Sequence, residues 1–213
     1  DGHPVMTDKI ILTGATGFFG RHTLPVLEEH YGTENVIGFG SADYDLTDPV
    51  AVERMFVENN PNIIVHYAAY SGGIGANRQF PGDFFYRNTL LTALMFDAAV
   101  RHGVKKLLYP MGGCSYPAKA VSPISEDQLW QGYPQEESAC YSTAKMMGLV
   151  AARSYHQQHG LNASVVIPGN LYGQYDNFHS EFADVVPGTL PPFLLSSLFS
   201  SSFLSFSLPF SPL

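Results

Sequence analysis

The sequence predicts an α/β protein in which helices cover a parallel, doubly wound β-sheet. Short apolar runs of three to five residues alternate along the chain with longer segments of helical periodicity. A glycine-rich turn, residues 14–20, lies between the first apolar run and the first helical segment. Parallel strands need crossover connections, so this alternation favours a parallel sheet that binds ligands at the carboxyl ends of its strands.

Each predicted element follows from its residues in chain order. Aliphatic runs bounded by polar or glycine-rich segments predict buried strands at residues 10–12, 36–39, 63–67, 106–109 and 164–167. Apolar residues three and four apart predict helices at residues 17–31, 49–59, 84–102 and 141–159. The chain is therefore predicted to hold one α/β domain.

Composition limits the classes of partner. With 45% hydrophobic residues in 213, the chain can bury a substantial core. Its formal charge is -8 and no Lys/Arg stripe is present, which argues against nucleic acid as a partner. Cys114 and Cys140 lack the spacing of metal ligands, and no secretory segment opens the sequence. We therefore expect a cytoplasmic protein without a metal site.

The last 23 residues differ from the rest. Residues 191–213 contain only Pro, Phe, Leu and Ser, with eight serines, four prolines and no charge. Serine and proline at this density argue against a membrane helix and favour low-complexity sequence outside the fold. The predicted folded domain spans residues 6–190, and residues 1–5 are left out of it.

The glycine-rich turn is typical of a dinucleotide-binding site. It precedes a helical pattern carried by Leu24, Val26 and Leu27, so it lies in the strand–turn–helix context that makes glycine spacing informative. Without side chains, the glycines let backbone N–H groups approach a pyrophosphate, whose charge the helix dipole favours. The turn predicts a nucleotide cofactor rather than a flexible loop.

Tyr141 and Lys145 are the candidate catalytic pair. Four residues apart on a predicted helix, they share one face, where the ammonium favours the phenolate and lowers the tyrosine's pKa. Such a tyrosine can transfer a proton near neutral pH. The same spacing also occurs on ordinary surface helices, so the glycine turn upstream is what favours an active site.

Six stretches carry a family resemblance: residues 44–48, 68–77, 114–117, 141–145, 168–173 and 176–179. In them, the chain resembles the extended short-chain dehydrogenase/reductase family (NAD-dependent epimerase/dehydratase family), and within it the GDP-L-fucose synthases. The resemblance implies a Rossmann-type sheet, a homodimer, NADP(H) as cofactor with NAD(H) as the alternative, and a nucleotide-sugar substrate. It also implies that most of the C-terminal substrate domain is missing.

The resemblance further implies roles for particular residues. Tyr141 would protonate the substrate's C4 oxygen, Lys145 would hold the cofactor ribose, and Cys114 would shuttle the epimerisation proton. The positions that match cofactor contacts are Gly14, Thr16, Gly17, Phe18, Phe19, Gly20, Asp45, Leu46, Ala68, Ala69, Lys145, Pro168, Asn170 and Leu171. The alternatives are structural roles: Cys114 would be a small buried side chain, and Asp45 or Asp48 would cap the N-terminus of a helix.

Two positions depart from the family pattern. Gly112 stands where the family has a serine that binds the substrate ketone, and Asp184 stands where it has a histidine acid. The end of the second strand carries no cation for a 2'-phosphate, although Arg21 could reach it, and Asp43 is no clear ribose ligand.

These departures leave three functions open. The first is an NADP(H)-dependent epimerase/reductase that converts GDP-4-keto-6-deoxymannose to GDP-L-fucose, in a truncated form. The second is another NDP-sugar epimerase or dehydratase. The third is a non-catalytic NAD(P)-binding module.

Overall fold

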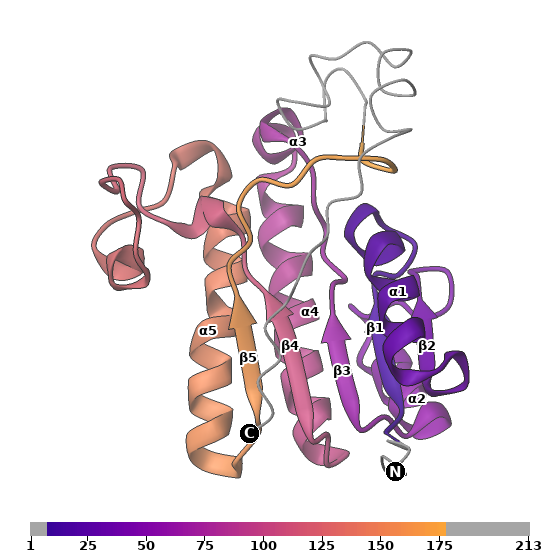
Figure 1. The fold of residues 1–213 in the computed structure, drawn as a ribbon. Helices are drawn as coiled ribbons and strands as arrows, with labels where there is room; N and C mark the ends of the chain where they lie inside the picture. The colour runs from indigo at the N-terminus through magenta and orange to yellow at the C-terminus, as the bar shows by residue number, and fades with distance from the viewer. Residues whose placement is uncertain (1–7, 178–213) are drawn as a thin grey trace.

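A computed structural model describes residues 8–177, and it contains a five-stranded parallel sheet (Figure 1). The strand order is β2-β1-β3-β4-β5. The bounds are β1 (Ile10–Thr13), β2 (Val36–Phe39), β3 (Ile63–His66), β4 (Lys106–Pro110) and β5 (Ala163–Val166). The prediction of a doubly wound parallel sheet is confirmed, and each predicted strand lies within one residue of its observed bounds.

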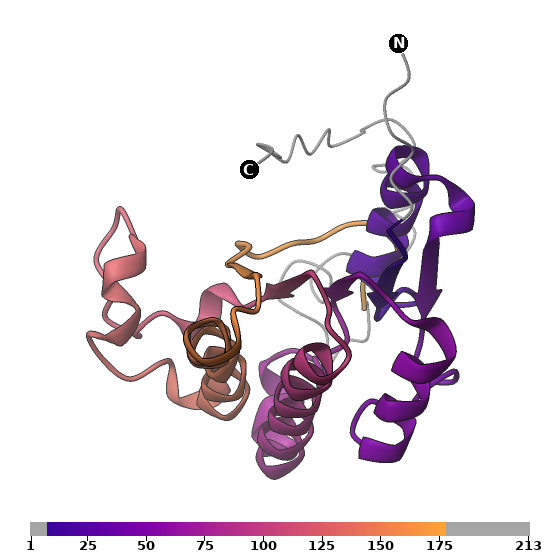
Figure 2. The ribbon, with the colours of Figure 1, turned by 90° about the horizontal axis from the view of Figure 1, so that it is seen from below.

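Helices cover both faces of this sheet, as the view in Figure 2 shows. On one face, α1 packs against β1 and β2; on the other lie α2, α4 and α5. The bounds are α1 (Phe18–Tyr31), α2 (Pro49–Asn59), α3 (Ile74–Gln79), α4 (Pro81–Arg101) and α5 (Ala139–His159). Four short 3-10 helices complete the described elements: η1 (Thr33–Asn35), η2 (Gly113–Ser115), η3 (Glu126–Trp130) and η4 (Glu136–Ser138).

Helix boundaries are where the prediction was incomplete. Helix α4 begins at Pro81 rather than at residue 84, because a proline at the first helical position needs no backbone N–H partner. The short α3 was not predicted at all, since six residues show too little periodicity. Asp48 is the N-cap of α2 and accepts a hydrogen bond from Val50 N at 2.9 Å, as the capping alternative proposed.

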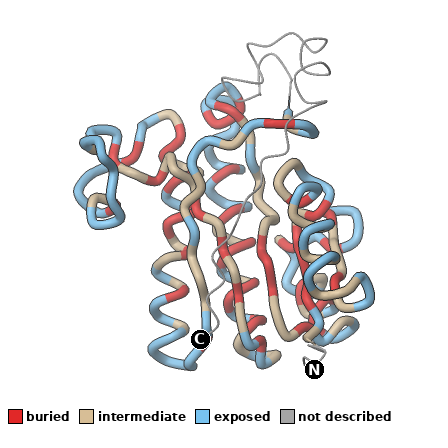
Figure 3. Tube along the Cα trace, in the orientation of Figure 1, coloured by how far each residue is buried: buried red, intermediate tan, exposed pale blue. Residues whose placement is uncertain are grey.

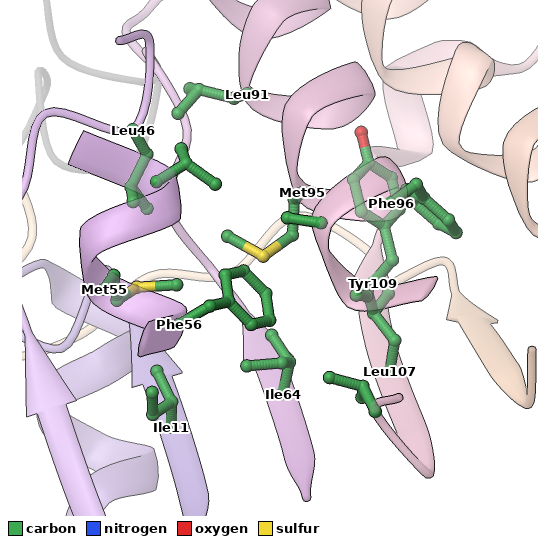
Figure 4. Packing of buried hydrophobic residues seen from close by; sticks show 14 of the residues in the cluster. Ile11, Leu46, Met55, Phe56, Ile64, Leu91, Met95, Phe96, Leu107 and Tyr109 are labelled. Atoms are coloured by element: carbon green, nitrogen blue, oxygen red, sulfur yellow. The ribbon is translucent and has the colours of Figure 1, made fainter. Parts of the chain in front are cut away.

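The core lies mainly between the sheet and the layer formed by α2 and α4. Figure 3 shows buried residues along the strands and on the inner sides of the helices. Figure 4 shows Phe56 of α2 and Met95 of α4 packed over Ile64, with Met55 of α2 on the side of Ile11. Each such side chain, fully removed from water, contributes about 1.5–3 kcal/mol. Three strands and three helices are thereby joined in one cluster, which holds the strand ends in fixed positions.

Membrane helices and the domain boundary can be assessed only within the described residues. No helix within residues 8–177 has the length and apolar character that a membrane crossing requires. The predicted domain end at residue 190 and the low-complexity segment 191–213 lie outside the described residues.

Candidate active site

The glycine turn folds tightly against the loop that follows β3. Gly14 has φ +70°, and a Cβ on it would stand 2.8 Å from Ala68 N. A Cβ on Gly20 would stand 2.2 Å from the carbonyl oxygen of Gly14. Both contacts are too short for any side chain, so the sequence needs glycine at these positions to bring α1 this close to the strand ends.

The open end of the turn faces solvent. Gly17 is the exposed N-cap of α1, and no side chain caps the helix. Thr13 Oγ1 accepts a hydrogen bond from Ala68 N at 3.2 Å, which fixes the neighbouring loop. Phe19 stacks on Tyr67 with ring centroids 4.3 Å apart and therefore packs between α1 and β3. The uncapped N–H groups of α1 form the kind of end that binds phosphate.

Residues 168–177, which we call the strap, run from the end of β5 across the carboxyl ends of the strands to α1 (Figure 1). His22 Nε2 lies 3.0 Å from the carbonyl oxygen of Gln174, and a Cβ on Gly173 would contact the Phe18 ring at 3.3 Å. The guanidinium of Arg21 lies 5.0 Å from the centroid of the Tyr175 ring. The strap thus joins the last strand of the sheet to the helix that follows the first.

The strap also carries three residues predicted to contact cofactor. Pro168 lies near η2, because a Cβ on Gly113 would stand 3.3 Å from the Pro168 carbonyl oxygen. Asn170 is exposed and Leu171 is half-buried. All three follow β5 directly, at the edge where a parallel sheet binds ligands.

The acidic residues after β2 are held by local hydrogen bonds. Asp45 Oδ1 accepts from Thr47 Oγ1 at 2.7 Å and from Thr47 N at 3.0 Å, and these bonds lower the pKa of Asp45. Asp43 Oδ2 accepts from Gly40 N at 2.8 Å. The side chain of Leu46 is buried in the core, so only its backbone is left to contact a cofactor.

Gly112, Cys114 and Tyr141 converge in space. A Cβ on Gly112 would lie 3.0 Å from Cys114 Sγ and 3.4 Å from Tyr141 Cε1. Ser142 Oγ donates to the Cys114 carbonyl at 3.0 Å, and Ser115 Oγ donates to the Ser142 carbonyl at 3.4 Å. This reciprocal pair ties η2 to the first turn of α5, so a thiol and a phenol flank the same small volume beside Gly112.

Lys145 lies one turn further along α5 and is only 4% exposed. Burial lowers the pKa of Lys145 to about 7, while the electrostatic interaction with Cys114 acts in the opposite direction. Its Nζ lies 4.1 Å from the centroid of the Tyr109 ring, on β4. The ammonium therefore sits against an aromatic face rather than in water.

Sequence reasoning missed three residues around Lys145. His66 is fully buried, with Nδ1 2.9 Å from Thr13 Oγ1, and its ring is stacked 6.0 Å from Tyr109. Burial, and to a smaller extent the charge of Lys145, lower the pKa of His66 to about 3, while a hydrogen bond with the Leu91 backbone acts in the opposite direction. A Cβ on Gly148 would stand 2.2 Å from the Tyr109 ring. An isolated glycine inside a helix, three residues after Lys145, was the one available signal of this close approach.

Asn88 connects α4 to the loop that carries the alanines after β3. Its Oδ1 accepts from Tyr70 N at 3.0 Å, and its Nδ2 donates to the Tyr70 carbonyl at 2.9 Å. Both ends of the amide are therefore used, and the loop containing Ala68 and Ala69 is fixed to a buried side chain.

Some predicted positions are not assembled in the described structure. Asp184, at the place of the family's histidine acid, lies outside residues 8–177. Within the described range, no group of three or more His, Cys, Asp or Glu side chains is arranged to hold a metal ion.

The fold and site define a class: a nucleotide-binding α/β protein with a Tyr-x-x-x-Lys pair at the carboxyl edge of a parallel sheet. The sequence pattern of the NAD dependent epimerase/dehydratase family matches residues 10–195. The chain belongs to that family.

Named relatives share about half of their length with this chain. GDP-L-fucose synthase 1 of Arabidopsis thaliana is 36% identical over 185 residues, which are 87% of this chain and 57% of the relative. GDP-L-fucose synthase of Escherichia coli (strain K12) is 33% identical over 87% of this chain and 57% of the relative. A GDP-L-fucose synthetase from Naegleria fowleri, solved bound to NADP, superposes with TM-score 0.75 at 32% identity, covering 85% of this chain and 59% of that one.

Proposed function

We propose that this chain is the cofactor-binding part of an NADP(H)-dependent enzyme that epimerises and reduces GDP-4-keto-6-deoxymannose to GDP-L-fucose. The observation that carries the proposal is the convergence of Tyr141 and Cys114 beside Gly112, with Lys145 buried behind them. Similarity to GDP-L-fucose synthases over 87% of the chain supports the substrate class.

The residues around the glycine turn fit a dinucleotide. Gly14 and Gly20 bring the backbone closer than any side chain would allow, and exposed Gly17 leaves the N-terminus of α1 open to a pyrophosphate. The loop held by Asn88 and the strap after β5 would flank the rest of the molecule. When bound, the nicotinamide supplies the hydride for the reduction.

The chain's own residues handle the protons. Tyr141 donates a proton to the oxygen at C4, and the nearby positive charge of Lys145 stabilises the phenolate that remains. Cys114 is placed to remove or deliver a proton beside the ketone, because its thiol flanks the same volume as the Tyr141 ring. The serine pair that ties η2 to α5 keeps these two groups at a fixed separation.

Arg21 supports NADP(H) over NAD(H). The end of β2 lies against the glycine turn, since a Cβ on Gly40 would stand 2.7 Å from Thr16 Oγ1. Arg21 Nε donates to the Thr16 carbonyl at 2.8 Å, which places an exposed guanidinium at this corner. Asp43, the acid that could bind a ribose hydroxyl here, already accepts a hydrogen bond from Gly40 N. A 2'-phosphate is therefore the better match.

Titration with NADPH and with NADH, followed by thermal stabilisation and fluorescence, tests the proposal. A ligand that binds only the folded state raises its stability by mass action. We expect saturable binding of NADPH, weaker binding of NADH, and a loss of about tenfold or more in NADPH affinity for Arg21→Gln. Arg153→Gln, at an exposed position of α5, is the matched control. Binding of neither dinucleotide would reject the function.

A homodimer through α4 and α5 is the second part of the proposal. The two helices pack side by side, with Thr89 Oγ1 3.7 Å from Met147 Sδ. Large apolar side chains on them are exposed: Phe85, Tyr86 and Val150 at 46%, 63% and 49%. Light scattering of the purified protein should give twice the mass of one chain, and Tyr86→Glu should return it to one. A monomer without the substitution would contradict the dimer.

Gly112 favours a second candidate, an NDP-sugar epimerase or dehydratase of different chemistry. No hydroxyl is available from this position, because glycine replaces the family's serine beside Tyr141. Assays with UDP- and dTDP-sugars beside GDP-4-keto-6-deoxymannose distinguish the two candidates. Turnover of a UDP- or dTDP-sugar alone would replace the first candidate with the second.

A further inference from the structure

We propose that Tyr109 is a positioning residue for Lys145, and that its ring face holds the ammonium in place and favours its charged form inside the protein. The contact joins β4 to α5, with Nζ 4.1 Å from the ring centroid. A cation over an aromatic face is attracted by the ring quadrupole, most strongly where water is excluded. Lys145 is 4% exposed and Tyr109 is fully buried, so this contact is of the desolvated kind.

The ring is fixed by contacts on several sides. Its hydroxyl lies 2.8 Å from Thr92 Oγ1 of α4. The rings of His66 and Phe96 pack against it, at centroid distances of 6.0 and 5.7 Å. On the side of α5, Gly148 leaves the space that the ring edge occupies. A ring with this little freedom can set the position of the ammonium that rests on it.

Lys145 and Gly148 both contact the Tyr109 ring. Residues three apart in a helix share one face, so both positions lie on the side of α5 that packs against β4. A side chain at residue 148 would push the ring away from the helix and from the ammonium. This explains a glycine in the interior of α5, where it weakens the helix.

Within residues 8–177, no ion pair joins Lys145 to an Asp or Glu carboxylate. The groups that interact with it are Cys114 from η2, His66 from β3 and Tyr109 from β4, and Tyr141 precedes it by one turn of α5. Burial raises the pKa of Tyr109 and lowers that of His66, so both rings are neutral near pH 7. The aromatic face therefore offsets part of the cost of burying the ammonium.

The catalytic meaning of this contact rests on the proposed function, but its test needs neither cofactor nor substrate. The chain has five lysines, so their side chains can be followed one by one by NMR of protein labelled with ¹³C,¹⁵N-lysine. Lys145→Met identifies the signal by its loss. In the unsubstituted protein, the ring current of Tyr109 should move the ε-methylene protons of Lys145 upfield of those of the other four. An ε-methylene signal at the ordinary position would overturn the proposal.

Variants of Tyr109 then separate the effect of its ring on the titration of Lys145 from the effect of its hydroxyl. Tyr109→Phe keeps the ring, so Lys145 should titrate within about 0.3 pH unit of the unsubstituted protein. Tyr109→Leu removes the ring, and the titration should move to lower pH by about one unit or more. Gly148→Ala, which displaces the ring without removing it, should act in the same direction. Arg153→Gln, at an exposed position of the same helix, is the control.

The outcomes are distinguishable from those for the proposed function. If Tyr109→Leu folds and Lys145 titrates unchanged, the ring does not hold the ammonium. If Tyr109→Leu does not fold, Gly148→Ala decides by the same criterion together with the ε-methylene shift. Failure of NADPH to bind, with the Lys145 titration behaving as expected, would reject the proposed function and leave the positioning role standing.

Discussion

Gly112 lies against Tyr141, at a place where a Cβ would stand 3.4 Å from the phenol's Cε1. The backbone of Gly112, with φ -100° and ψ 145°, suits any residue. The volume beside the Tyr141 phenol could therefore hold a small side chain, but glycine at residue 112 supplies none. The contact at 3.0 Å with Cys114 Sγ asks only for a small rotation of the thiol.

Gly112→Ser should add a hydroxyl beside Tyr141 without unfolding the protein. We expect a melting temperature within about 3 °C of the original, because the cost of the tight contact is below about 1 kcal/mol. In single-turnover NADPH oxidation with GDP-4-keto-6-deoxymannose, the serine variant should react about tenfold faster than Gly112→Ala, because a second donor stabilises the developing oxyanion. Equal rates for the two variants would show that the hydroxyl has no role here.

Gly20→Ala and Gly17→Ala should separate folding from cofactor binding. A Cβ on Gly20 meets the Gly14 carbonyl at 2.2 Å, so Gly20→Ala should cost about 3 kcal/mol or more and lower the melting temperature by roughly 6–12 °C. A Cβ on Gly17 meets the same oxygen at 3.4 Å, an ordinary contact. Gly17→Ala should therefore keep its melting temperature while NADPH affinity falls, because the methyl stands at the phosphate end of α1. A variant of Gly17 that binds NADPH normally would argue against this end as the phosphate site.

Lys145→Met should stabilise the protein by removing a buried cation. The folded pKa of about 7 lies below the ordinary 10.5, so the unfolded chain binds more protons between these values and stability rises with pH through that window. Below about pH 7 the variant should be more stable by roughly 2–4 kcal/mol, and the gain should shrink toward pH 10. Urea unfolding of both proteins at several pH values measures this, with exposed Lys119→Met as the control. A gain that is independent of pH would contradict the burial of a charged Lys145.

His66 should make the fold sensitive to acid. Its pKa of about 3 in the folded protein lies below the ordinary 6.5, so its contribution to stability is complete above pH 6.5 and falls as the pH drops toward 3. The slope from this one residue reaches about 1.4 kcal/mol per pH unit. His66→Gln should flatten the pH dependence in this window, whereas Thr13→Val removes the hydrogen bond to Nδ1 and should keep the slope. Parallel acid unfolding curves for His66→Gln and the unsubstituted protein would contradict this assignment.

The strands could be predicted because their signal is local. Residues 10–12, 36–39 and 107–109 each form a continuous apolar run, and burial on both faces of a parallel sheet requires such runs. Thr13 and His66 interrupt this pattern as polar residues at the strand ends, where they bond each other across the sheet. The glycine turn was equally predictable, since its glycine spacing and its place before a helix are properties of adjacent residues, whereas the close approach of Gly14 to Ala68 is not.

The surroundings of Lys145 could not be predicted because they are not local. Tyr109 reads as one more buried residue of a strand, and only the packing of β4 against α5 brings its ring beneath the ammonium. The engagement of Asp43 by Gly40 and the approach of the strap to α1 depend on loop geometry in the same way. Spacing along the sequence predicted Tyr141 and Lys145 as a catalytic pair, but it did not predict the side chains that surround Lys145.

The strap has a consequence for how the cofactor site forms during synthesis. The glycine turn and α1 leave the ribosome about 150 residues before Gly173, Gln174 and Tyr175, which contact α1. The turn and the start of α1 can therefore fold before the strap exists, and the strap reaches them only after all five described strands have been made. An N-terminal fragment that ends before the strap would carry the turn with one wall of the site absent.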